Sequence, residues 1–217
     1  MEHCRNFLKA LRPALTITLV LILICGLAYP LLMNSLSAVL FPKQASGSLV
    51  LVNGKAVGSE YVGQEFTADH FMKGRPSAVH YNTYTVDADG KEIYLDGSAF
   101  TGLASGSSNY GPSNPALTER VEADMEKFLA ANSDIKREDI PTDLLTASGS
   151  GLDPHISPKA AAIQLPSIAD ASGLSMEELE QIVQDNTTGK LLGILGEETV
   201  NVLGVNVDIA EAMGLTQ

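Results

Sequence analysis

The stretch from Ala14 to Met33 reads ALTITLVLILICGLAYPLLM, and no charged residue occurs between Pro13 and Pro42. A helix of about 20 residues rises about 30 Å, which matches the hydrocarbon core of a bilayer. A helix in a soluble domain normally keeps one polar face, whereas this one is apolar on every side. Ser35-Leu36-Ser37 resembles a signal-peptide cleavage site, but secretory apolar regions are shorter, at about 7–15 residues. The stretch therefore predicts a retained transmembrane helix.

The charges around this stretch predict its orientation. Arg5, Lys9 and Arg12 precede it with only Glu2 against them, and every other Asp and Glu of the chain follows it. Lys and Arg close to a span favour the cytoplasmic side of the membrane. We therefore expect a single-pass protein of the cell (inner) membrane, with its N-terminus in the cytoplasm and the rest of the chain outside.

The residues after the stretch predict one domain with mixed secondary structure. About 175 residues are enough for a single hydrophobic core. Hairpin signals come first and helix signals later, which is typical of an α+β domain. The chain is thus expected to divide into three parts: a cytoplasmic N-terminus (1–12), a transmembrane helix (13–36) and one extracytoplasmic α+β domain (37–217).

Turn residues predict two hairpins near the start of this domain. Asn53-Gly54 lies between two apolar runs, 48–52 and 55–58, and this dipeptide favours a type I′ turn. Asp87-Ala-Asp-Gly90 lies between two further β-prone runs, 82–86 and 91–95.

Capping residues predict the helices. Asn114 followed by Pro115 begins a helix that runs to about Ala131, and Ser175 with Glu178 forms a capping box for another. Four further predictions concern the C-terminal third: a short helix through 160–165 that ends at Pro166, a helical turn over 167–171 closed by Gly173, a strand over 200–207, and a short helix over 209–215.

The composition excludes several classes of function. A formal net charge of −12 argues against nucleic acid as a partner, because that partner attracts a basic face. Cys4 and Cys25 are the two cysteines, so no disulfide framework and no thiolate metal site is possible after residue 42. The histidines after that point are scattered and lack the helical spacing of a metal site.

Two readings remain open from the residues alone. One is an anchored external domain without catalytic machinery. The other is a membrane-anchored extracytoplasmic hydrolase that uses Ser148 or Ser150, since Asp153 and His155 follow closely. Neither serine has the flanking glycines of a nucleophile elbow, and triad members so close in sequence rarely reach the required geometry.

A set of motifs in order along nearly the whole chain resembles one family. The motifs are RPALT from Arg12, YPLL from Tyr29, LFP from Leu40, GRPS from Gly74, GPSNPAL from Gly111, TASGSGLDPHISPKAA from Thr146, and VNVL from Val200 with Asn206. The chain resembles the C subunit of the Kdp-type potassium-transporting P-type ATPase.

This resemblance implies a non-catalytic subunit of an ATP-driven, high-affinity potassium import complex. The implied partners are a channel-like potassium-translocating subunit, a P-type ATPase subunit, a small membrane peptide and the lipid bilayer. ATP and potassium are used by the complex, and no cofactor is expected on this chain itself. The family's C subunit is described as a catalytic chaperone that raises the ATP affinity of the ATPase subunit. An external domain cannot touch cytoplasmic ATP, so we expect any such effect to pass through the assembled complex.

The residues expected to contact partner subunits lie in the span and in three polar loops. The external loops are expected near the point where potassium enters the complex. The candidates are Gly26, Pro30, Gly74, Arg75, Pro76, Ser77, Ser105, Asn109, Ser113, Asn114, Ser148, Ser150, Asp153 and His155.

Overall fold

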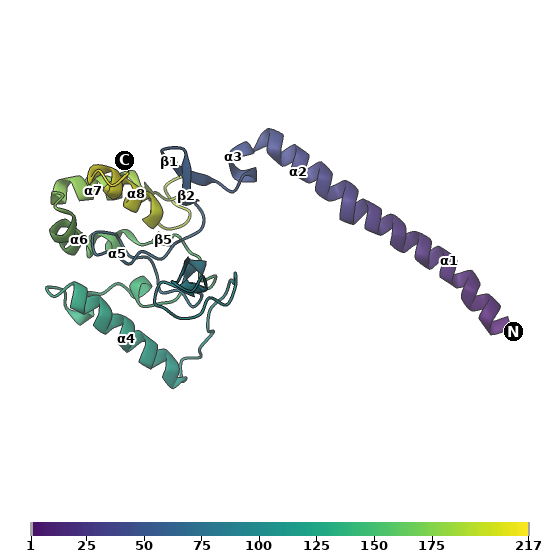
Figure 1. The fold of residues 1–217 in the computed structure, drawn as a ribbon, viewed down its shortest axis with the longest axis horizontal. Coiled ribbons are helices and arrows are strands. Elements are labelled where there is room, and N and C mark those ends of the chain that lie inside the picture. Colours follow the sequence, from purple (N-terminus) through teal and green to yellow (C-terminus); the bar gives the residue numbers. More distant parts are fainter. Residues whose placement is uncertain (1, 217) are drawn as a thin grey trace. The chain divides into compact units, whose positions relative to one another are not determined.

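The apolar stretch lies within one long helix. The computed structural model describes residues 2–216 and divides between Leu49 and Val50 into a helical unit and a globular unit (Figure 1). The helical unit contains α1 (Glu2–Leu23), the π-turn η1 (Ile24–Ala28), α2 (Tyr29–Leu40) and the short α3 (Pro42–Ala45). Leu11–Leu40 is long and apolar enough to cross a membrane, and its side chains are unburied.

Pro30 explains the π-turn in the middle of this helix. A proline lacks the N–H of an α-helical hydrogen bond and its ring clashes with the carbonyl four residues earlier, here that of Gly26. The backbone widens before it, so that the Tyr29 N–H bonds to the carbonyl of Ile24, five residues back. A Cβ added at Gly26 would meet only Ile22, at 4.0 Å. Of the two candidate contact residues of the span, Gly26 therefore lies in the widened turn and Pro30 in the first turn of α2 directly after it.

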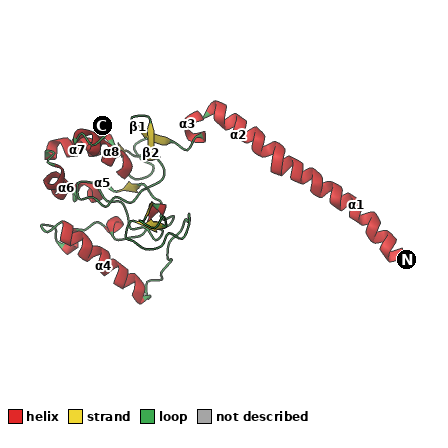
Figure 2. Cartoon of the chain, in the orientation of Figure 1, coloured by secondary structure: helices red, strands yellow, loops and turns green. Residues whose placement is uncertain are grey.

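The globular unit combines helices with small sheets, which confirms the α+β class with one N-terminal apolar helix (Figure 2). Among residues 49–216 the strands and α-helices are β1 (Leu49–Val52), β2 (Lys55–Ser59), β3 (Tyr84–Val86), β4 (Glu92–Tyr94), α4 (Pro115–Ala131), β5 (His155–Ile156), α5 (Pro158–Ala162), α6 (Leu165–Ser172), α7 (Met176–Asp185), β6 (Thr187–Thr188), β7 (Thr199–Asn201) and α8 (Val202–Ala212).

Both predicted hairpins are confirmed. β1 and β2 pair across Asn53 and Gly54, whose φ angles of 50° and 77° are those that a type I′ turn requires. β3 and β4 pair antiparallel with Tyr84 opposite Tyr94. The side chain of Asp87 closes their turn by accepting hydrogen bonds from the N–H groups of Asp89 and Lys91.

A third, antiparallel sheet has the order β5-β7-β6 and was not predicted as such. Ile156 lies opposite Val200, and Thr188 lies opposite Thr199. The two outer strands have only two residues each, too short to show an alternating pattern. The fully buried Val200 of β7 ties this sheet to the core.

The core lies between this sheet and the helices. Helix α4 is confirmed with Asn114 as its cap, and α7 begins with the predicted capping box. The side chains that fill the core come mostly from the C-terminal half of the chain. They include Met72, Met125, Ile156, Ala160, Ala161, Leu165, Ile168, Leu179, Val200, Val205 and Ile209.

Two of the predicted elements are wrong. Pro166 does not end a helix; it lies in the first turn of α6, where a proline is tolerated because the N–H it lacks has no helical acceptor. The expected strand over 200–207 ends at Asn201, whose side chain accepts a hydrogen bond from the Gly204 N–H and begins α8. The closing of α6 by Gly173, at φ 75°, is confirmed.

Candidate functional site

Three polar loops from distant parts of the globular unit meet in one place. We call this the loop cluster, and it comprises 74–77, 105–106 and 146–155. Hydrogen bonds join each loop to the last of them, which carries most of the family-specific motif. The structure thus brings together Gly74, Arg75, Pro76, Ser77, Ser105, Ser148, Ser150, Asp153 and His155 from the expected contact residues.

Arg75 links the first loop to both ends of the third. Its Nε and Nη2 donate to the carbonyl of Thr146, at 3.3 Å and 3.2 Å, and its Nη1 donates to Oδ2 of Asp153 at 2.9 Å. The carbonyl of Arg75 in turn accepts the hydroxyl of Tyr81 at 2.6 Å. A planar guanidinium with several donors suits this task, which a lysine could not perform.

Ser77 and Gly151 bring the first loop close against the third. The Ser77 hydroxyl donates to the carbonyl of Gly151 at 2.7 Å and accepts the N–H of Tyr81. Gly151 has a φ of 69°, and a Cβ there would lie 2.7 Å from the carbonyl oxygen of Gly106. Only glycine fits this position, because both the conformation and the space exclude a side chain.

Ser105 and Gly106 bring the second loop against the third. The Ser105 hydroxyl and the Gly106 N–H both donate to the carbonyl of Ser150, at 3.1 Å and 2.8 Å. The Ser148 N–H donates to the carbonyl of Pro76 at 3.2 Å. The backbone of the Gly/Ser-rich motif is thus held from two sides by other loops.

Two buried amides fix the segment that leads into the first loop. Asn206 on α8 accepts the N–H of Met72 at 2.7 Å and donates to its carbonyl at 2.9 Å. Gln164 does the same for Lys73, at 2.9 Å and 3.2 Å. Both amides are nearly inaccessible to solvent, so they pair the polar backbone atoms of a segment that crosses the core.

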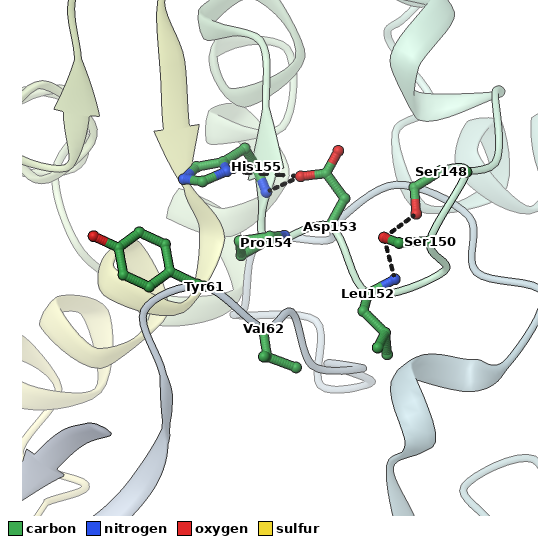
Figure 3. A pocket seen from close by; sticks show the side chains of 9 residues that line it. Tyr61, Val62, Ser148, Ser150, Leu152, Asp153, Pro154 and His155 are labelled. Atoms are coloured by element: carbon green, nitrogen blue, oxygen red, sulfur yellow. Dashed lines mark hydrogen bonds and ion pairs between the residues drawn. The ribbon is translucent and has the colours of Figure 1, made fainter. Parts of the chain in front are cut away.

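The serines do not assemble a triad with His155. Ser148 is 2% exposed and its hydroxyl accepts the N–H of Gly151, while the hydroxyl of Ser150 accepts the N–H of Leu152. The Nδ1 of His155 faces Oδ1 of Asp153 at 3.6 Å. Figure 3 shows the imidazole on one side of Asp153 and both serines on the other. These side chains border an open pocket of about 470 Å³, and neither serine forms a hydrogen bond with His155 in the part of the chain that the structure describes.

The surroundings of Asp153 favour the ionised form of its carboxyl group. The neighbouring side chain of His155, the His155 N–H and Arg75 lower the pKa of the Asp153 carboxyl, although burial opposes them. Burial raises the pKa of the Tyr81 hydroxyl. Among residues 2–216 no group of three His, Cys, Asp or Glu side chains is arranged to hold a metal ion. The polar groups of the cluster bond to one another and hold its three loops together.

Other expected contact residues lie apart from the cluster. Asn109 accepts the hydroxyl of Ser107, and Asn114 caps α4 as expected. Ser113 is exposed beside that cap. Gly26 and Pro30 belong to the helical unit.

Sequence reasoning missed three residues that hold the cluster. Tyr81 is 9% exposed and its φ is 53°, but a lone tyrosine in a polar segment gives no signal of burial. Gln164 lies between apolar residues, and an amide side chain in such a place is a sequence signal of a buried hydrogen bond. Gly151 was part of the motif without being distinguished from its neighbours.

Comparison with protein families shows one match across nearly the whole chain. Residues 11–211 match the family model described as "KdpC: K+-transporting ATPase, c chain". The matched range contains the apolar helix 11–40, the loop cluster and α8 as far as Glu211.

Similar proteins carry the same family name. The chain is 57% identical over 210 residues to the "Potassium-transporting ATPase KdpC subunit" of Clostridium kluyveri, covering 97% of each chain. The protein of that name from Clostridioides difficile is 55% identical over 96% of this chain and 100% of its own. That from Caldanaerobacter subterraneus is 42% identical, over 94% and 95%. This chain belongs to the KdpC family of K+-transporting ATPase subunits.

Proposed function

We propose that this chain is the membrane-anchored C subunit of an ATP-driven potassium importer, and that it supports assembly and coupling without performing catalysis. The observation that carries the proposal is the family match over residues 11–211, together with relatives that are named as potassium-transporting ATPase subunits. The lack of an assembled triad at Ser148 and Ser150 supports a non-catalytic role over the hydrolase alternative.

In this proposal the chain crosses the cell membrane once. Residues 1–12 lie in the cytoplasm, 13–36 span the bilayer and 37–217 lie outside. The three cationic residues before the span support this direction, because positive charge is retained inside. The unburied helix 11–40 offers the widened turn at Gly26 and Pro30 to neighbouring membrane helices.

The proposed partners are a channel-like potassium-translocating subunit, a P-type ATPase subunit and a small membrane peptide. ATP is hydrolysed by the ATPase subunit on the cytoplasmic side. An external globular unit affects ATP affinity only through the states of the assembled complex, which is a coupling between distant sites. The acidic surface would attract potassium only if it lies close to the point where the ion enters the complex. Dissolved salt largely screens the interaction between charges that are more than about 8 Å apart.

Deletion of the gene for this chain tests the proposal. Cells that depend on this importer are expected to stop growing at micromolar potassium, and a plasmid copy of the chain should restore growth. The purified complex without this chain should need more ATP for half-maximal hydrolysis. Normal growth and normal ATP dependence after deletion would contradict the proposed function.

A further inference from the structure

The loop between β6 and β7 exposes a group of large apolar side chains. It reads KLLGILG from Lys190 to Gly196, and we call residues 190–196 the hairpin tip. The exposed fractions are 67% for Leu191, 83% for Leu192, 78% for Ile194 and 56% for Leu195. A cluster of this kind on a folded domain indicates a contact surface, whereas single exposed apolar residues are ordinary.

The hairpin tip has a defined shape. Leu191 and Leu195 exchange backbone hydrogen bonds of 2.8 Å and 3.0 Å, and Lys190 faces Glu197 at 3.7 Å. Below the tip, β6 pairs with β7, which is anchored in the core by Val200. A rigid apolar tip loses little conformational freedom when it binds, which favours association.

Leu192 lies in the turn of the tip. Its φ is 54°, in the left-handed region that a leucine rarely adopts. Gly193 follows with a φ of 76°, so the two residues form the turn of the tip and the leucine carries a local conformational cost there. The strained residue is also the most exposed member of the tip.

The charges near the hairpin tip indicate which kind of surface it binds. The chain is strongly acidic after the span, and Glu197 and Glu198 lie exposed at the base of the tip. An anionic lipid surface repels such a domain, and residues 190–198 lack the aromatic and multiple basic residues of membrane-surface segments. A second copy of the chain would bring the same acidic groups together. A polypeptide with an apolar pocket and a basic rim avoids both problems.

We propose that the hairpin tip docks into an apolar pocket with a basic rim on another polypeptide of the same potassium-transporting complex. This inference rests on the proposed function, because it takes the chain to be one subunit of that assembly. The tip then acts as an anchor, in which few buried aliphatic side chains supply most of the attachment.

A double substitution tests the tip in the complete complex. Leu192→Ser with Ile194→Ser should reduce recovery of the other subunits in mild detergent, and potassium uptake, by about tenfold or more, as for a central anchor. Leu103→Ser is the matched control, because Leu103 is 81% exposed outside the tip. Equal recovery from the double variant and the control would overturn the inference. If deletion of the whole chain also changed nothing, the proposed function itself would fail instead.

Crosslinking keeps the test independent of folding. The globular unit has no cysteine, so Ile194→Cys in a Cys4→Ser, Cys25→Ser background is a unique thiol. A photoreactive maleimide on this thiol should join the chain to another subunit of the assembled complex, and the same probe at Leu103→Cys should not. Adducts with lipid alone, or between two copies of this chain, would overturn the inference.

Discussion

The loop cluster and the hairpin tip lie in the same globular unit and differ in almost every physical property. The cluster is polar and internally bonded, with Ser148 at 2% exposure, whereas the tip is apolar and Leu192 is 83% exposed. The cluster contains the most distinctive motif of the chain, yet its polar groups are largely satisfied by one another. The difference shows that a distinctive sequence motif can serve contacts within the domain, whereas the surface that is free to bind a partner comes from a less distinctive segment.

The largest effect is expected at Gly151, where the cluster has no room. Gly151→Ala places a Cβ 2.7 Å from the Gly106 carbonyl oxygen at a positive φ, and should lower the free energy of unfolding by about 2–4 kcal/mol. Gly149→Ala is the matched control, because no atom lies within 4 Å of its Cβ position. Urea denaturation of the full chain in detergent measures both. Equal stability of the two variants would mean that the cluster is not a tight joint.

Arg75 should have the next largest effect. Arg75→Met removes the bonds to Thr146 and Asp153 and leaves a half-buried carboxylate, at a cost of about 1–3 kcal/mol. The matched control is Arg137→Met, whose exposed pair with Glu122 should contribute less than about 1 kcal/mol.

The same pair predicts a pH dependence. The folded pKa of Asp153 is lowered, so its contribution is complete above the unfolded pKa of about 4 and is lost as the pH falls through the lower, folded pKa. Asp153→Asn should therefore cost stability at pH 7 and approach the wild type in stability as the pH falls below 4. A difference that stays constant between pH 7 and pH 3 would contradict the role of this carboxylate.

Glu65 should have the smallest effect, with the opposite sign. Burial raises its pKa, and its Oε2 is buried without a hydrogen-bond partner, 3.8 Å from Nδ1 of His80. A raised folded pKa favours the protonated protein, so stability is lost as the pH rises through that value. Glu65→Gln should stabilise the chain by about 0.5–1 kcal/mol at pH 8 and by less at pH 4. Thermal unfolding at both pH values measures the change in stability, and Glu126→Gln, at an exposed position, is the control. If Glu65→Gln were destabilised at pH 8, the negative charge of Glu65 would be needed for stability.

Local signals predicted much of the fold because they act within a few residues. Asn53-Gly54 requires positive φ at both positions, and Asn114-Pro115 satisfies the N-terminus of a helix without distant help. The apolar run 14–33 needs no partner to be recognised. These features follow from backbone chemistry close to each residue.

The failures occurred where distant contacts decide the structure. In VNVLGVNVD the apolar residues alternate well enough for a strand, but the cap at Asn201 and burial of Val205 and Ile209 make a helix. The two-residue strands β5 and β6 exist only because β7 lies between them. No local pattern reveals pairing of that kind.

The residues of the loop cluster were predicted from the sequence, but the contacts between them were not, because these too depend on distant parts of the chain. The motif from Thr146 indicated which loops matter, and several of the expected residues do lie together. Their contacts with one another depend on Tyr81, Gln164 and Gly151, whose roles appear only in three dimensions. The hairpin tip was overlooked because KLLGILG resembles an ordinary core segment until its exposure is known.

Both regions bear on potassium import only if the globular unit lies outside the cell. Labelling of a single cysteine tests this most directly. Leu103→Cys in the Cys4→Ser, Cys25→Ser background supplies an exposed thiol that belongs to neither the cluster nor the tip. A membrane-impermeant maleimide should label it in intact spheroplasts as fully as after lysis. Labelling that appears only after lysis would place the globular unit in the cytoplasm and contradict the account.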